Sequence, residues 1–232
     1  DKVVGDLRGA WRVRAGATDR MQAVDYVAWF NAQGDGLNQD SPITGQLNQV
    51  TFASAGALSA VPGATTRFDP LITTSQEAQE IPAADVRTEP SPSRILAGFR
   101  PSGQRYTLAA RVSGPVRSAF QGDLPEGVEA PAERLSEARE PVNIVVVADA
   151  DVLEDRFWVR VQDFFGQQVA TPFSDNGAFV ANATEVLSGS SALIGLRSRG
   201  ESTRPFALVE GIRRDAERAY REREQALQKT LE

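Results

Sequence analysis

The predicted fold depends on residues 142–151, which read Val142-Asn143-Ile144-Val145-Val146-Val147-Ala148-Asp149-Ala150-Asp151. A short run of β-branched residues is typical of a strand that is covered on both faces, and acidic residues follow this run where a parallel strand would lead into a helix. Ligands of α/β folds bind at the carboxyl ends of such strands. Asp149 and Asp151 are therefore the first candidate ligand-binding residues.

Three further patterns complete the predicted architecture. Residues 151–165 carry apolar and aromatic side chains at helical spacing, and Asp175-Asn176 can cap a helix over residues 178–187. Residues 192–196 form a short apolar run typical of a strand. From residue 205 onward apolar residues recur every three or four positions, which predicts a long amphipathic helix. We expect an α/β fold with a mixed, mostly parallel layered sheet, flanking helices and this long C-terminal helix.

The chain of 232 residues is expected to divide into a domain over residues 1–204 and a C-terminal helix over residues 205–232. Polar, proline-containing stretches near 76–93 and 121–141 predict flexible loops. The chain begins with Asp1 rather than Met, so we expect a piece of a longer protein, incomplete at its N-terminal side. The terminal helix would then lead toward a membrane segment outside this chain.

The composition removes most catalytic machinery. The chain has no His and no Cys, and its only lysines are Lys2 and Lys229. Catalytic triads, cysteine nucleophiles, P-loops and the usual zinc sites are therefore excluded. A net charge of −6 argues against a nucleic-acid partner. We expect no cofactor and no metal, although carboxylates alone can still run a glycosidase-like mechanism.

The candidate site residues each admit a functional and a structural interpretation. Asp149 and Asp151 can coordinate a divalent ion or a sugar hydroxyl, or one of them can cap a helix that starts near Val152. Arg197 and Arg199 follow the 192–196 strand on one face and can hold an anion, or they can pair with nearby acids. The structural interpretation is favoured for both pairs.

Aromatic and apolar residues outside this region also have two interpretations. Trp11, Trp29 and Trp158 can stack on sugars, but core or interface anchoring is favoured. The apolar stripe of the terminal helix is hard to bury within one domain, which indicates packing against a partner. The predicted partner interface comprises Leu208, Ile212, Ala216, Tyr220 and Leu227.

Several segments, taken together and in this order, carry a family resemblance: residues 40–47 with 52–56, 68–75, 106–115, 145–158, and 175–179 through 187–200. The chain resembles the GldG-like auxiliary proteins of gliding-motility-type ABC transport systems, an uncharacterised ABC-transporter auxiliary family. The resemblance implies a periplasmic domain, held by membrane segments on either side, that works beside an ABC permease and an ATPase. It transfers no catalytic residue.

Our leading hypothesis is a non-enzymatic extracytoplasmic domain of an ABC-transporter auxiliary subunit that acts through protein partners, with homo-oligomerisation left open. The alternative is a module that binds a glycan or small polar ligand at the carboxyl end of the strand at 142–148. A carboxylate-dependent hydrolase is the third hypothesis, and it requires two carboxyl groups about 5–9 Å apart over an open groove.

Overall fold

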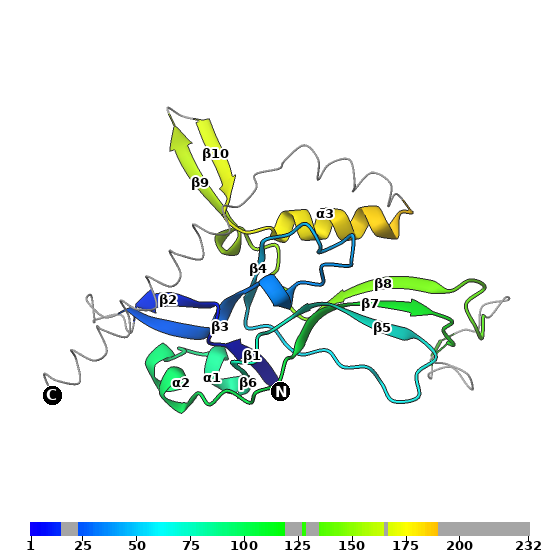
Figure 1. The fold of residues 1–232 in the computed structure, drawn as a ribbon, viewed down its shortest axis with the longest axis horizontal. Helices are drawn as coiled ribbons and strands as arrows, with labels where there is room; N and C mark the ends of the chain where they lie inside the picture. Colours follow the sequence, from blue (N-terminus) through cyan, green and yellow to red (C-terminus); the bar gives the residue numbers. More distant parts are fainter. Residues whose placement is uncertain (15–22, 119–126, 129–134, 165–166, 190–232) are drawn as a thin grey trace, which may run out of the picture. The chain divides into compact units, whose positions relative to one another are not determined.

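The structure is a computed structural model, and it describes residues 1–14, 23–118, 127–128, 135–164 and 167–189 (Figure 1). The chain divides into two units, Asp1–Ile194 and Gly195–Glu232, and all of the described residues belong to the first. The predicted strand at 192–196 and the predicted helix at 205–232 lie outside the described residues. The predicted domain boundary at residue 204 stays a prediction.

The elements follow one another along the chain with strands predominating. In the described residues the strands are β1 (Lys2–Asp6), β2 (Ala10–Arg14), β3 (Ala23–Gln33), β4 (Gln49–Ala53), β5 (Arg67–Thr73), β6 (Ala78–Pro82), β7 (Thr107–Gly114), β8 (Val142–Val147), β9 (Val159–Phe164) and β10 (Gln167–Pro172). The helices are α1 (Ala84–Arg87), α2 (Pro92–Gly98) and α3 (Asn176–Leu187), with short 3₁₀ turns η1 (Gly34–Gly36) and η2 (Asp155–Phe157).

Every strand pairing in the described part of the chain is antiparallel. The sheets have the orders β1-β6, β2-β3-β4, β5-β7-β8 and β10-β9. The expectation of a mostly parallel, layered α/β fold is therefore wrong. Parallel neighbours need long crossover connections that are usually helical, whereas β2 to β4 and β9 to β10 follow one another as strand neighbours.

Strand β8 lies where the sequence predicts a strand, but its surroundings differ from the prediction. It is an edge strand that pairs antiparallel with β7. Val145 and Val147 pack against the core, whereas Ile144 is 45% exposed and Val146 is 36% exposed. β-branched residues fit a pleated strand on either face, so the run predicts a strand without distinguishing a buried strand from an edge strand.

The helix predicted over 151–165 is absent. A turn, η2 and β9 occupy these residues. Phe157 is buried as a single aromatic anchor, whereas Leu153 is exposed and Val161 lies on the two-stranded β9-β10 sheet. The aromatic spacing that imitates a helix therefore reflects separate contacts of these side chains.

The helix predicted over 178–187 is confirmed as α3, which begins two residues earlier. The predicted loop at 76–93 is instead structured: it contains β6, α1 and the start of α2. Ser91 caps α2 by accepting a hydrogen bond from the Arg94 N–H, with Pro92 as the first helical residue, which is a common helix start. Much of the second predicted loop, near 121–141, lies outside the described residues.

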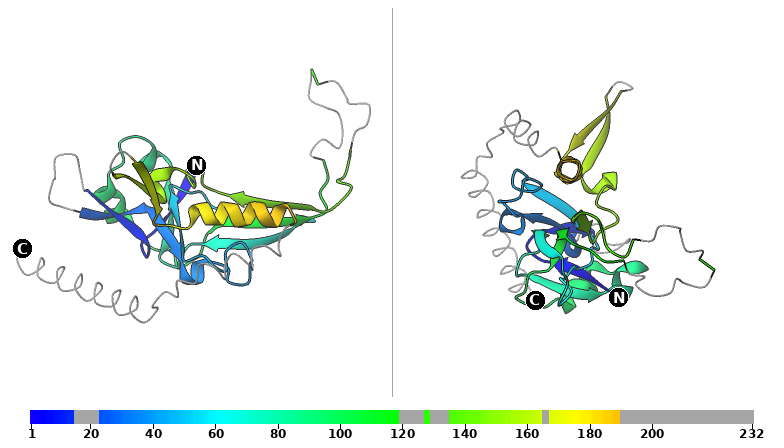
Figure 2. Two further views of the ribbon diagram at one scale, coloured as in Figure 1. Left: turned by 90° about the horizontal axis from the view of Figure 1, so that it is seen from above. Right: turned by 90° about the vertical axis from the view of Figure 1, so that its right-hand side faces the viewer.

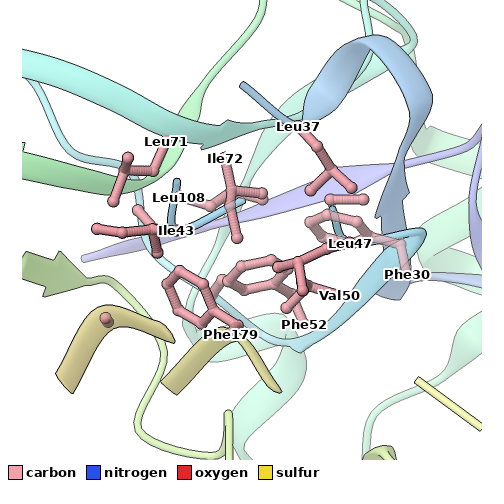
Figure 3. Packing of buried hydrophobic residues seen from close by; sticks show 14 of the residues in the cluster. Phe30, Leu37, Ile43, Leu47, Val50, Phe52, Leu71, Ile72, Leu108 and Phe179 are labelled. Carbon is pink, nitrogen blue, oxygen red and sulfur yellow. The ribbon is translucent and has the colours of Figure 1, made fainter. Parts of the chain in front are cut away.

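The main core lies between the sheets and α3. Phe30, Phe52, Ile72, Leu108 and Phe179 are fully buried there (Figure 3), and they come from β3, β4, β5, β7 and α3. Views from two other directions show α3 running alongside the β5-β7-β8 sheet (Figure 2). A second cluster, between β3, β6 and α2, contains Tyr26, Val27, Ala28, Ile81, Ile95 and Phe99.

A buried asparagine joins three parts of this core. The Asn176 side chain, at the start of α3, is fully buried. Its Oδ1 accepts hydrogen bonds from the Thr51 N–H at 2.9 Å and the Ser174 hydroxyl at 2.8 Å. Its Nδ2 donates to the carbonyl oxygens of Thr51 and Val152, both at 2.8 Å. The amide therefore joins β4, the turn after β8 and α3.

Candidate functional site

Asp149 follows β8 with its carboxylate turned into the protein, and the residue is only 8% exposed. Its Oδ2 accepts a hydrogen bond from the Ala53 N–H at 2.7 Å, and its Oδ1 accepts one from the Asp151 N–H at 2.8 Å. Burial raises the pKa of Asp149, and these two hydrogen bonds oppose that rise. With both oxygens engaged, the carboxylate joins the end of β8 to β4.

Asp151 lies on the surface; its N–H donates to Asp149 Oδ1, and its own negative charge adds to the rise in the pKa of Asp149. No helix begins at Val152; residues 150–153 form a turn instead. The Asp149 carboxylate still does what a capping side chain does, because it accepts the backbone N–H two residues ahead. Asp149 therefore acts as a capping residue, as one interpretation predicted, but it caps a turn and not a helix.

The remaining predicted site residues all belong to the C-terminal part of the chain. Arg197 and Arg199 lie outside the described residues, as do the predicted partner-contact residues Leu208, Ile212, Ala216, Tyr220 and Leu227. Their roles stay predictions. Within the described ranges no three acidic side chains gather in the way that metal ligands do.

The structure brings together aromatic residues that are far apart in the sequence. Phe157 packs against Trp11 and Trp29, with ring centroids 5.7 Å and 5.1 Å away, and Phe173 lies 6.0 Å from Trp11. Trp11 and Trp29 also meet edge to face at 6.2 Å, and Tyr26 extends the cluster. Offset and edge-to-face pairs of this kind stabilise a cluster beyond the area they bury.

Two arginines lie on this aromatic cluster. The Arg156 guanidinium is 4.6 Å from the ring centroid of Phe157 and 5.8 Å from that of Trp29. The Arg160 guanidinium lies 5.7 Å from the ring centroid of Phe173. A guanidinium that stacks on a ring face still directs the N–H groups at its edge toward other partners, and it loses little side-chain entropy.

These side chains line a cleft of about 500 Å³. Its walls come from β2, β3, η2, β9 and the residue after β10, and they comprise Trp11, Asn31, Arg156, Val159, Arg160, Val161 and Phe173. The volume falls within the range of small-molecule sites. We call this feature the aromatic-arginine cleft.

Sequence reasoning singled out the tryptophans but missed the cleft. Trp29 packs against the second core cluster, in line with the predicted anchoring, whereas Trp11 belongs to the aromatic cluster and also lines the cleft. Trp158 does not, since its ring lies against Gly177 at the start of α3. Arg156 and Arg160 were not predicted as site residues, because they lie within a segment predicted to be helical. An alternating strand pattern in residues 159–164 was the one available clue.

The chain belongs to a family of auxiliary components of ABC-type transport systems. Residues 1–183 match the family model described as an ABC-type uncharacterized transport system. No curated protein matches the chain, and no solved structure does. Among the helices that the structure describes, none is long and apolar enough to cross a membrane.

Proposed function

We propose that this chain is a non-enzymatic, extracytoplasmic domain of an ABC-transporter auxiliary subunit, and that it acts by contacting the permease and ATPase of the transporter. The observation that carries the proposal is the family match over residues 1–183. The family match supports a role in an ABC-type transport system in general. The closer kinship with GldG-like, gliding-motility-type proteins belongs to the proposal.

The chemistry of the chain supports a role without catalysis. His and Cys are missing from the sequence, which leaves carboxylates as the main candidates for acid and base catalysis. The most suspect of these, Asp149, uses both carboxylate oxygens to hold backbone N–H groups. This arrangement favours a structural role for Asp149, and it gives no support to a ligand module or a hydrolase built at the end of β8.

Exposed apolar side chains support a role in partner binding. The β9-β10 hairpin exposes Val161 (49%) and Val169 (43%). A two-stranded hairpin is only marginally stable by itself, so packing against another protein would stabilise it. We place the main contact on the terminal residues Leu208, Ile212, Ala216, Tyr220 and Leu227, as the amphipathic pattern predicts.

The proposed location is the periplasmic face of the inner membrane, with anchoring through segments outside this chain. An ABC permease spans the membrane, so an auxiliary domain beside it has to be held near the bilayer. Self-association of the subunit within the complex is part of this proposal, because the apolar stripe that the sequence predicts can serve both kinds of contact.

The test is affinity purification of the full-length protein from detergent-solubilised membranes. We expect the permease and ATPase to co-purify with the wild type and to be lost when Leu208, Ile212 and Tyr220 are changed together to Ser. A matched control changes Val61, which is 72% exposed, to Ser and should retain both partners. Failure of the wild type to recover either subunit would contradict the proposal.

A further inference from the structure

We propose that the aromatic-arginine cleft binds a saccharide that carries a carboxylate, such as a uronic acid unit. The inference depends on the cleft alone and is independent of the proposed transporter partners. Arg160 would pair with the carboxylate, the rings of Trp11 and Phe173 would receive an apolar sugar face, and Asn31 would donate to a ring hydroxyl.

The polar groups of the cleft are donors. Asn31 Oδ1 already accepts hydrogen bonds from Trp11 Nε1 at 3.0 Å and from the Thr51 hydroxyl at 2.8 Å. These bonds fix the orientation of the amide. The amide nitrogen, Nδ2, has no hydrogen-bond partner within the described ranges. Nδ2 adds two N–H donors to those of Arg156 and Arg160. A ligand that satisfies them has to be rich in acceptors.

The apolar groups of the cleft require a ligand with a flat, weakly polar face. The Trp11 indole N–H is used by Asn31, so the tryptophan offers carbon atoms of its ring to a ligand. Phe173 lies beside it, 6.0 Å between centroids, and both residues are half-buried. A pyranose presents C–H groups on one face and hydroxyls at its rim, which matches rings beside donors.

The charge of the cleft indicates a single negative charge on the ligand. Arg156 already pairs with Glu154, whose Oε1 lies 3.4 Å from its Nε, so these two residues cancel. Arg160 has no carboxylate partner in the described part of the chain. One unmatched guanidinium suits a carboxylate of charge −1 better than a phosphate monoester, which carries about −1.5 to −2 near neutral pH.

The size of the cleft fits the same class. About 500 Å³ is enough for a short oligosaccharide but is a small part of a polymer-binding groove. The protein as a whole carries a net charge of −6, which disfavours long polyanions through repulsion. We therefore expect a short acidic saccharide or the charged end of a longer one.

The experiment is isothermal titration of the purified full chain with methyl galacturonoside, which carries one carboxylate, with its methyl ester as the matched neutral ligand. We expect binding of the acid and at least roughly tenfold weaker binding of the ester, because a charged hydrogen bond is lost. Arg160→Gln should weaken binding of the acid by a similar factor. The control Arg87→Gln, which changes an exposed arginine on α1, should bind as the wild type does.

Phe173→Leu provides a second variant that keeps the charge and removes one ring, and it should also weaken binding. Thermal unfolding of each variant separates lost binding from lost folding. Equal affinity for the acid and its ester would overturn the proposal, as would binding that persists unchanged in Arg160→Gln. Absence of heat at about 10 mM methyl galacturonoside, roughly ten times a millimolar Kd, would also overturn it. Binding of AMP or an acidic peptide without binding of methyl galacturonoside would overturn the proposal and place the cleft in another ligand class.

Discussion

Changing Asn176 to Ala should be among the most destabilising polar substitutions in the chain. The amide makes four hydrogen bonds of 2.8–2.9 Å within a fully buried site. Removing it strands the N–H and C=O of Thr51 and the C=O of Val152. A stranded buried polar group costs about 1–3 kcal/mol, and partial relaxation keeps the sum well below three such losses. We expect Asn176→Ala to lower the free energy of unfolding by about 2–4 kcal/mol.

Asn176→Asp separates the donor role from the acceptor role. The carboxylate keeps an acceptor for Thr51 N–H but turns its other oxygen toward two carbonyl oxygens. Protonation relieves this repulsion, so the folded pKa of the new carboxyl should lie above its unfolded value. Relative to the wild type, the variant should then be most stable below about pH 4 and lose stability as the pH rises through that raised pKa.

The assay is urea unfolding of the full chain, followed by circular dichroism and repeated across the acid range. Asn182→Ala is the matched control, because Asn182 lies in the same helix and makes one hydrogen bond, from Nδ2 to the Ile43 carbonyl at 3.1 Å. Its loss should be largely offset by the better helix propensity of Ala. A cost below about 1 kcal/mol for Asn176→Ala, or equal costs for the two variants, would refute the reasoning.

Three other substitutions test separate features. Burial raises the pKa of Asp149, so the stability of the wild type relative to Asp149→Asn should be greatest below about pH 4 and fall as the pH rises, measured by urea unfolding at each pH. Gly9→Ala should cost about 1–3 kcal/mol in the same assay, because the new Cβ would lie 2.3 Å from the backbone oxygen of Asn31. Gly177→Ala should cost less, since its Cβ would meet the Trp158 side chain at 2.7 Å instead of backbone and Ala favours the helix. Tryptophan fluorescence should report the displaced ring, whose Nε1 donates to the Leu153 carbonyl. A large loss of stability in Gly177→Ala with unchanged fluorescence would contradict this account.

Local sequence patterns predicted elements better than they predicted neighbours. The run at 142–147 is a strand and the segment before Leu187 is a helix, because propensity and helix-start signals act within a few residues. Strand direction is set by pairing with β7, whose residues lie 28 to 38 positions earlier in the chain than their partners. A β-branched run does not indicate which strand it pairs with or in which direction, so the prediction of a parallel sheet was wrong.

The cleft shows that local sequence patterns also fail to predict a site built from residues far apart in the chain. Trp11 lies about 145 residues before Arg156, and only the fold places them together. The acidic residues after β8 attracted attention because their position resembles that of ligand sites in parallel sheets. In an antiparallel fold that argument lapses, and Asp149 is instead a buried acceptor for two backbone N–H groups.

The most direct test of the central claim is reciprocal purification, with the affinity tag on the ATPase of the transporter instead of on this protein. If the chain is an auxiliary subunit, complexes purified from solubilised membranes should contain it in a fixed ratio to the permease, measured by quantitative mass spectrometry. That ratio should persist through a second purification step. Permease and ATPase recovered together without this protein, at expression levels where it is abundant in the membrane, would contradict the account.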